Sequence, residues 1–358
     1  MAVMGTRTLL LLLTATIPLL AVAGEIRGVK ERERKGKASC VLVFGDSSVD
    51  PGNNNRLPLA PKSNFPPYGK DLFHGRPTGR FSNGRLATDF IAEAMGYTHV
   101  LPGFLDPTLN TMDLLHGVSF ASAGSGYDDL TANLSNALSV SKQLDYFRHY
   151  RIHLRQLVGE KKAEKIIRNA LFIISMGSND FLQNYFFYPT RSKQFTLKQY
   201  QFFLTSRMLE AVKAMHHMGA RRVAVVGIPP LGCIPVVKAV KGESMAKCIE
   251  EYNKVALSYN SNVQDKLASL NASLPIRIAF IDIYFVIARA INNPKRYGFI
   301  ETSKGCCGSG MIEAGDTCKG MSSCADPTKY VFWDAVHPTE HMYKIVAAQA
   351  LRSLAGMI

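Results

Sequence analysis

Short apolar runs that alternate with amphipathic stretches most constrain the fold of this 358-residue chain. An apolar run bounded by Gly, Ser, Asp or Asn is typical of a strand buried on both faces. Such runs cover residues 40–44, 171–176, 222–226 and 276–281, with a weaker one at 117–121. Helical patterns occupy residues 85–95, 141–157, 197–217, 244–270 and 339–354. The alternation predicts a three-layer α/β/α sandwich around a mostly parallel sheet.

The N-terminus has the pattern of a secretory signal peptide over residues 1–23. A basic start leads into an apolar run at residues 9–22, and a small-residue cleavage site precedes Gly24. A membrane anchor is disfavoured, because a spanning helix needs roughly 20 apolar residues. Residues 24–37 are predicted to be a flexible charged tail. Residues 38–358 contain no linker or repeat, so we expect a single domain, secreted to the extracellular side with no stable membrane anchor.

The formal net charge of +14 raises the question of a polyanionic partner. Outside the charged tail the basic residues are dispersed, and the sequence contains no nucleic-acid-binding motif. The secretory pattern therefore favours an acidic extracellular polysaccharide, as in a cell wall, over nucleic acid.

The cysteine pattern suits an oxidising compartment. Cys306 and Cys307 are adjacent, and a bond between them would be strained. They are expected to pair with Cys318 and Cys324, in an order that the sequence leaves open. A four-cysteine zinc site is the alternative, disfavoured by the adjacent pair and the secretory pattern.

The other cysteines and two glycosylation sequons also fit an extracellular protein. Cys233 and Cys248 are expected to close a separate loop, which leaves Cys40 as a buried free thiol. The sequons begin at Asn133 and Asn271, and each predicts an N-linked glycan on the surface.

Ser47 follows the first apolar run, in the sequence Gly-Asp-Ser-Ser. In open α/β sheets the site lies beyond the carboxyl ends of the strands, so a serine there is held where a nucleophile is useful. The alternative is a side chain that caps the following helix. The sequence G-x-S-x-G is absent around Ser47, so this is not an ordinary α/β-hydrolase.

Two further loops supply candidate hydrogen-bond donors. Asn179 follows the run at residues 171–176, where its amide can point at a developing oxyanion. Gly124 lies among small residues that allow a backbone N–H to approach a ligand closely. The alternatives are a turn or cap at Asn179 and a flexible loop around Gly124. A phosphate loop is disfavoured, because no Gly-Lys-Ser/Thr follows.

Asp334 precedes His337 by three residues, in a loop that Pro338 ends. The carboxylate can fix the imidazole tautomer so that the other ring nitrogen faces a serine. A metal site is the weaker interpretation, because no second histidine lies at ligand spacing.

Taken in order, these motifs resemble those of GDSL esterases/lipases, in the plant branch of the SGNH hydrolase superfamily. The resemblance covers about residues 41–354. It rests on F-G-D-S-S-V-D-P-G-N-N, G-R-F-S-N-G-R, F-A-S-A-G-S-G, G-S-N-D and F-W-D-A-V-H-P-T-E, with P-P-L-G-C-I-P and C-C-G as plant-branch markers. It implies a flavodoxin-like sandwich with a five-strand parallel sheet, and no cofactor.

The resemblance also implies residue roles. Ser47 would be the nucleophile, His337 the base and Asp334 the acid that orients it. The backbone N–H groups of Ser47 and Gly124 and the side chain of Asn179 would form the oxyanion hole.

Two positions depart from the family pattern. Ser119 stands where many relatives carry Asn, which leaves the catalytic set intact. Ser48 stands where Leu is commoner and sets a second hydroxyl beside the nucleophile.

The predicted function is hydrolysis of a carboxylic ester through an acyl-enzyme. An acyltransferase would use the same residues. A non-catalytic binding protein on this scaffold is disfavoured, because all the expected catalytic residues are present. Residues 181–188 carry five aromatic side chains that could line an acyl pocket, although a place in the core is slightly favoured.

Overall fold

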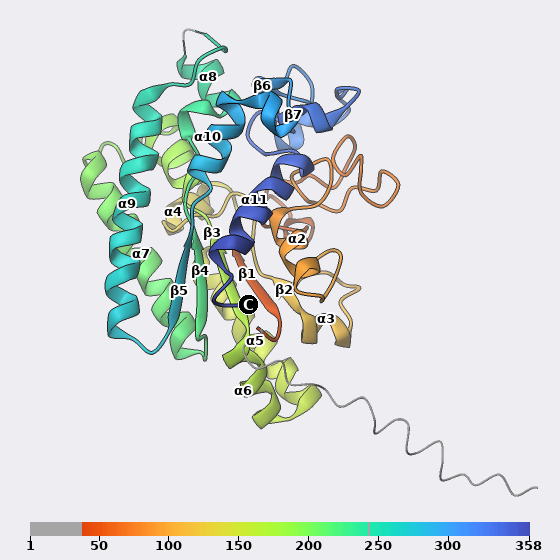
Figure 1. The fold of residues 1–358 in the computed structure, drawn as a ribbon, viewed down its shortest axis with the longest axis vertical. Coiled ribbons are helices and arrows are strands. Elements are labelled where there is room, and N and C mark those ends of the chain that lie inside the picture. Colours follow the sequence, from red (N-terminus) through yellow and green to blue (C-terminus); the bar gives the residue numbers. More distant parts are fainter. Residues whose placement is uncertain (1–37, 243) are drawn as a thin grey trace, which may run out of the picture. The chain divides into compact units, whose positions relative to one another are not determined.

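The computed structural model describes residues 38–242 and 244–358, so the predicted signal peptide and charged tail lie outside the described residues. Five parallel strands form the central sheet in the order β2-β1-β3-β4-β5 (Figure 1). The strands are β1 (Val41–Gly45), β2 (Gly117–Ser119), β3 (Leu171–Ser175), β4 (Arg222–Val226) and β5 (Arg277–Ile281). The five-strand parallel sheet is therefore confirmed.

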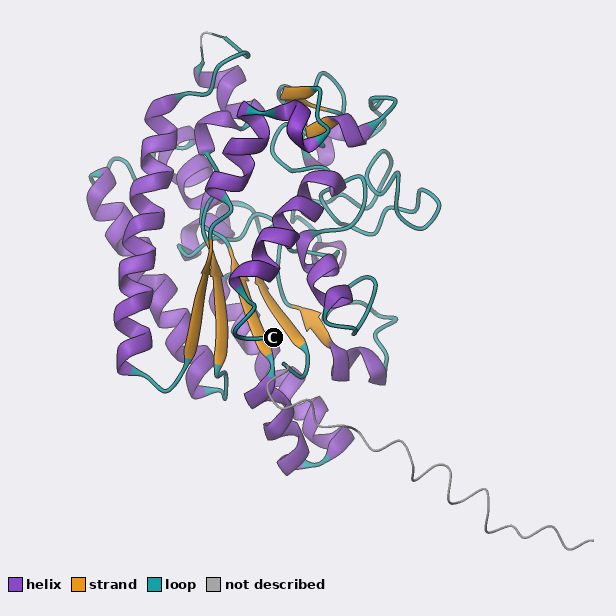
Figure 2. Ribbon diagram, in the orientation of Figure 1, coloured by secondary structure: helices purple, strands orange, loops and turns teal. Residues whose placement is uncertain are grey.

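Helices surround this sheet (Figure 2). They are α2 (Ala87–Ala94), α3 (Thr111–His116), α4 (Asp129–Leu134), α5 (Val140–Val158), α6 (Glu160–Asn169), α7 (Leu197–His217), α8 (Pro235–Lys241), α9 (Glu250–Ser273), α10 (Tyr284–Asn292) and α11 (Glu340–Ser353). A π-helix covers Asp180–Phe187, and a small second sheet pairs β6 (Glu301–Gly305) with β7 (Tyr330–Phe332).

Side chains of each strand alternate between two separate cores, because the side-chain period of a strand is two. Leu42 and Phe44 of β1 pack on one face with residues of α5, α6, α7 and α9. Val41 and Val43 pack on the other face with residues of α2, α10 and α11. Burial on both faces explains why the strands read as continuous apolar runs.

One predicted helix boundary is wrong. The pattern predicted a helix from residue 244, but α9 begins at Glu250. Cys248 is bonded to Cys233, and the Ile249 N–H donates to the Gly232 carbonyl at 2.9 Å. These contacts hold the segment before α9 against another loop, so it cannot continue the helix. The other four predicted helices end within two residues of α2, α5, α7 and α11.

Three disulfides join Cys233 to Cys248, Cys306 to Cys324, and Cys307 to Cys318. The pairing that the sequence left open is thus Cys306 with Cys324 and Cys307 with Cys318. All four sulfur atoms are bonded, so none is left as a thiolate to bind zinc. Cys40 is a buried free thiol, and burial raises its pKa to about 12.

In the part of the chain that the structure describes, every helix is too short or too polar to span a bilayer.

Candidate active site

Ser47 lies just beyond the carboxyl end of β1, beside the end of β3. The Asp46 N–H donates to the Ser175 carbonyl at 3.0 Å, which continues the pairing of the two strands. A Cβ on Gly45 would lie 2.2 Å from that same carbonyl oxygen, so only glycine fits there. The close approach of the two strands fixes the turn that carries Ser47.

The structure brings Ser47, His337 and Asp334 together, although 290 residues separate the first two. The His337 Nε2 atom lies 2.8 Å from the Ser47 Oγ atom. On the other side of the ring, Nδ1 lies 2.9 Å from Asp334 Oδ1 and 2.8 Å from Oδ2. A carboxylate can only accept, so Nδ1 carries the proton and Nε2 accepts from the serine hydroxyl.

Asp334 is fully buried and has several donors around it. Its Oδ1 atom accepts from the backbone N–H groups of Val336 and His337, at 2.8 and 2.7 Å. The Tyr68 hydroxyl donates to Oδ2 at 2.6 Å. A buried carboxylate with this many donors is well solvated by the protein and held in one orientation.

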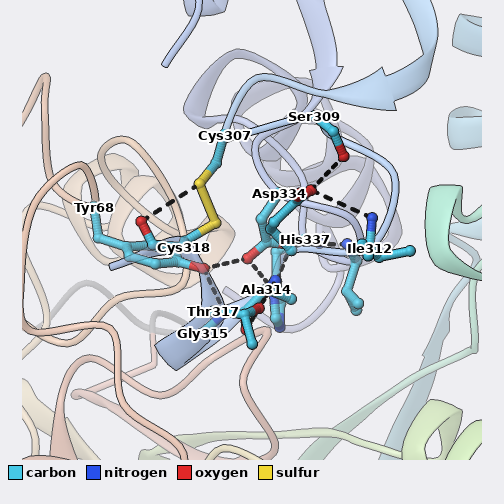
Figure 3. The surroundings of a disulfide bond; sticks show 12 residues. Tyr68, Cys307, Ser309, Ile312, Ala314, Gly315, Thr317, Cys318, Asp334 and His337 are labelled. Carbon is cyan, nitrogen blue, oxygen red and sulfur yellow. Dashed lines mark hydrogen bonds and ion pairs between the residues drawn. A yellow bond between two sulfur atoms is a disulfide. The ribbon is translucent and has the colours of Figure 1, made fainter. Parts of the chain in front are cut away.

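Tyr68 was not singled out by the sequence analysis. Figure 3 shows its hydroxyl between Asp334 and Gly315, whose N–H donates to the Tyr68 oxygen at 2.7 Å. Burial, with the nearby Asp334 charge, raises the pKa of Tyr68 well above its ordinary value, so the hydroxyl keeps its proton. Gly315 lies in the loop that the Cys307–Cys318 disulfide closes. The disulfide therefore helps to position Tyr68, which in turn positions Asp334.

Ser48, the second hydroxyl, faces other partners. It donates to Asp46 Oδ1 at 2.7 Å and lies 3.0 Å from the Ser175 Oγ atom. Burial raises the pKa of Asp46, while hydrogen bonds from Ser48 and the nearby His337 act against the rise. The Ser48 hydroxyl is thus used to satisfy a buried carboxyl group, and of these two neighbouring serines it is Ser47 whose hydroxyl lies against the imidazole.

Gly124 has a φ of +87°, in the left-handed region that favours glycine. Its loop is held by side chains from the turn after β1, which the sequence analysis did not single out. Asp50 Oδ2 accepts from the Ala123 N–H at 3.0 Å, and the Asn54 amide donates to the Ala123 carbonyl at 2.9 Å. The only sequence signal for this support is the polar run D-P-G-N-N after Ser47.

Asn179 follows β3, and its side-chain amide donates to the Ser125 carbonyl at 2.9 Å. An amide nitrogen carries two hydrogens, so this bond fixes the side chain and leaves a second donor. Ser47 and Asn179 line the same cavity, together with His337. Across the described residues, the backbone N–H groups of Ser47 and Gly124 have no hydrogen-bond partner.

Asp180 ties the loops of Asn179 and Gly124 to each other. It is fully buried and accepts from the Thr131 hydroxyl at 2.6 Å and from the Tyr127 N–H at 2.9 Å. Burial raises the pKa of Asp180 to about 7, although these hydrogen bonds act to lower it.

Comparison with known proteins agrees with this architecture. A family model described as GDSL-like Lipase/Acylhydrolase matches residues 41–350. The chain belongs to this family. It is 50% identical over 346 residues to GDSL esterase/lipase At5g45950 of Arabidopsis thaliana, which covers 96% of both chains. It is 44% identical over 320 residues to GDSL esterase/lipase At5g45960 of the same plant, which covers 87% of this chain and 85% of that one.

Solved structures that match this chain at low sequence identity include an esterase and a lipase. A catalytic mutant of an acetylxylan esterase from Geobacillus stearothermophilus has a TM-score of 0.42 at 14% identity, covering 89% of this chain and 95% of that one. The lipase Lip_vut3 from a goat rumen metagenome has a TM-score of 0.39 at 12% identity, covering 88% and 97%. The prediction of a plant-branch GDSL protein with the SGNH sandwich is confirmed by the family match and the sheet.

The raised pKa of Asp180 predicts a pH-dependent stability. Between about pH 4 and 7 the folded protein binds a proton at Asp180 that the unfolded chain has lost. This contribution to the free energy of unfolding is present at low pH and is lost as the pH rises to about 7. Asp180→Asn cannot titrate, so its urea-unfolding free energy should fall less than that of the wild type between these pH values.

The control is Asp145→Asn, at a half-exposed carboxylate on α5 that pairs with Arg148. It should keep the wild-type pH dependence. Equal pH slopes for Asp180→Asn and the wild type would contradict the assignment.

Proposed function

We propose that this protein is a secreted ester hydrolase in which Ser47 is acylated, with His337 as base and Asp334 as the orienting acid. Membership of a lipase/acylhydrolase family supports the reaction class. The observation that carries the residue assignment is the 2.8 Å contact between Ser47 Oγ and His337 Nε2, with Nδ1 of the same ring on a buried carboxylate.

The first half of the reaction acylates the serine. His337 Nε2 takes the hydroxyl proton of Ser47 as Oγ attacks the ester carbonyl, and the imidazolium is stabilised by Asp334. The tetrahedral oxyanion accepts hydrogen bonds from the backbone N–H groups of Ser47 and Gly124 and from Asn179 Nδ2. Each such donor contributes about 3 to 4 kcal/mol of transition-state stabilisation. His337 then protonates the leaving alcohol.

The second half releases the acid. His337 takes a proton from water, and the resulting hydroxide attacks the acyl carbonyl and forms a second oxyanion at the same donors. Collapse of this intermediate returns the proton to Ser47 Oγ. No step needs a cofactor.

Covalent labelling tests the nucleophile. Ser47→Ala should abolish labelling by a fluorophosphonate probe, because the attacking oxygen is gone. Ser48→Ala should still be labelled, because its hydroxyl contacts Asp46 rather than the imidazole. Intact-protein mass spectrometry measures both, and circular dichroism checks the fold. Persistent labelling of Ser47→Ala, or its loss only in Ser48→Ala, would overturn the assignment.

Tyr68 is proposed as a positioning residue, because it acts on the substrate only through Asp334. Tyr68→Phe removes a hydrogen bond to a charged group, worth about 1.5 to 3 kcal/mol. If that loss is expressed in the transition state, kcat should fall about ten- to a hundredfold, with KM nearly unchanged. Steady-state kinetics on a soluble ester measures the split.

Tyr330→Phe is the matched control, since Tyr330 packs against the same aromatic cluster but makes no hydrogen bond to Asp334. It should keep a near-wild-type kcat. A folded Tyr68→Phe protein with unchanged kcat would exclude the positioning role.

Secretion is proposed from the signal-peptide pattern at residues 1–23. Three disulfides support it, because such bonds persist in oxidising compartments. Asn133 and Asn271 are both exposed, on α4 and α9, and glycosylation of both is part of this proposal.

We propose an acidic cell-wall polysaccharide as a partner of the secreted protein. Arg168, Arg221, Arg222 and Arg277 line one open hollow at the end of the sheet opposite Ser47. Retention on immobilised polygalacturonate should therefore weaken with salt, because exposed charges are screened. The double variant Arg168→Gln/Arg277→Gln should elute at lower salt than the wild type. Retention that salt does not affect would contradict the proposal.

A further inference from the structure

A cavity of about 110 Å³ opens at Ser47 and His337 and extends inward between the sheet and helices α2, α10 and α11. We propose that it is the acyl-binding subsite and that it takes a short, unbranched aliphatic chain longer than acetyl. This inference rests on the proposed function, since it assigns the place of the acyl group that Ser47 would carry.

Helix α11 gives the cavity its direction. The helix begins at Glu340, three residues after His337, and its residues Tyr343, Val346 and Ala350 line the cavity. These side chains share one helix face, since they are spaced by three and four residues. Tyr343 and Ala350 are about 10 Å apart along the helix axis at 1.5 Å per residue. The cavity therefore leads away from the catalytic histidine along the face of the sheet.

The opposite wall is the sheet itself. Ile173 of β3, Val226 of β4 and Ile281 of β5 line it, and Ile287 of α10 closes the side. These four side chains are buried or half-buried aliphatic groups.

The carboxyl group of Asp46 and the imidazole of His337 are both at the catalytic end of the cavity. Most of the lining is aliphatic, so a sugar or a charged acid would lose more hydration here than the few hydroxyl groups of the wall, such as that of Tyr343, could replace. Each unreplaced hydrogen bond costs several kcal/mol by reference to apolar transfer. An aliphatic chain would instead gain from burial.

The volume limits the chain. A cavity of about 150 Å³ holds one benzene molecule, so about 110 Å³ suits roughly four carbons without displacement of the walls. The depth along α11 allows a somewhat longer chain if the side chains adjust. A long fatty chain would not fit, because overpacking of buried side chains is destabilising.

The aromatic stretch at residues 181–188 contributes little to this cavity. Phe181 is buried and packs against Tyr200 and Tyr259 in the core. From this stretch, only Leu182 lines the cavity. The core interpretation therefore holds for Phe181, whereas Tyr188 is exposed.

Chain-length kinetics on the full secreted protein tests the proposal. The substrates are p-nitrophenyl acetate, butanoate, octanoate, dodecanoate and hexadecanoate. Burial of each methylene should raise kcat/KM about fourfold, so butanoate or octanoate should exceed acetate by about tenfold or more. The value should then fall for dodecanoate and hexadecanoate. A maximum at acetate, or a continued rise to hexadecanoate, would overturn the proposal.

Variants on α11 test the position of the chain. Ala350→Phe fills the inner end and should lower kcat/KM for octanoate about tenfold, with acetate nearly unchanged. Ala348→Phe adds the same bulk on the exposed face and should keep the wild-type profile. Val346→Ala enlarges the cavity and should move the optimum to a longer chain. Profiles of Ala350→Phe and Val346→Ala that both match the wild type would exclude this cavity.

Labelling by ethyl fluorophosphonate, which carries no long chain, separates this test from the test of the nucleophile. If Ser47→Ala loses labelling while the chain-length profiles of the α11 variants equal that of the wild type, the subsite alone would be refuted. Labelling that persists in Ser47→Ala would refute the proposed function itself.

Discussion

The parallel pairing of β1 with β3, in register from Val41 and Leu171 to Gly45 and Ser175, is the constraint on which the site depends. Parallel strands bring their carboxyl ends to one edge, so the turn with Ser47 and the loop with Asn179 begin side by side. Burial on both faces leaves the strands no freedom to shift register, because a shift by one residue would exchange the two cores.

The proposed base, His337, comes from outside this sheet and is held differently. The loop of Asp334 and His337 follows β7 in the small second sheet, and the Trp333 N–H closes it by donating to the His337 carbonyl at 2.7 Å. Tyr68 and a disulfide-closed loop then fix Asp334 from a third side. A short loop that would otherwise sample many conformations thus presents one imidazole orientation. The conformational entropy of the loop is lost when the protein folds, so the reaction itself does not have to order it.

Local pattern in the sequence was sufficient for the strands, for most helices and for the candidate residues at strand ends. Apolar runs predict buried strands, and polar residues directly after them predict the edge of the sheet. The pattern did not predict the residues that support the site. Tyr68 bonds to Asp334 across 266 residues, and Asp180 accepts from Tyr127 across 53. A hydrogen bond at such separation leaves no periodicity in the sequence. The start of α9 at Glu250, rather than at residue 244, escaped prediction for the same reason. The disulfide between Cys233 and Cys248 holds the segment that precedes the helix.

The polar and apolar sides of Ser47 have opposite physical consequences for a substrate. On the side of Gly124, buried acceptors such as Asp50 and Asp180 hold the loops through backbone N–H groups, and burial raises the pKa of both, to about 6 and about 7. Their hydrogen bonds order the proposed oxyanion donors before any substrate arrives, which is the condition for strong stabilisation of an oxyanion. On the side of α11 the walls are mostly aliphatic and the hydroxyl of Tyr343 offers little in comparison, so a chain with few hydrogen-bonding needs gains most from entering. An ester bound with its carbonyl at the donors therefore has one orientation that satisfies both sides.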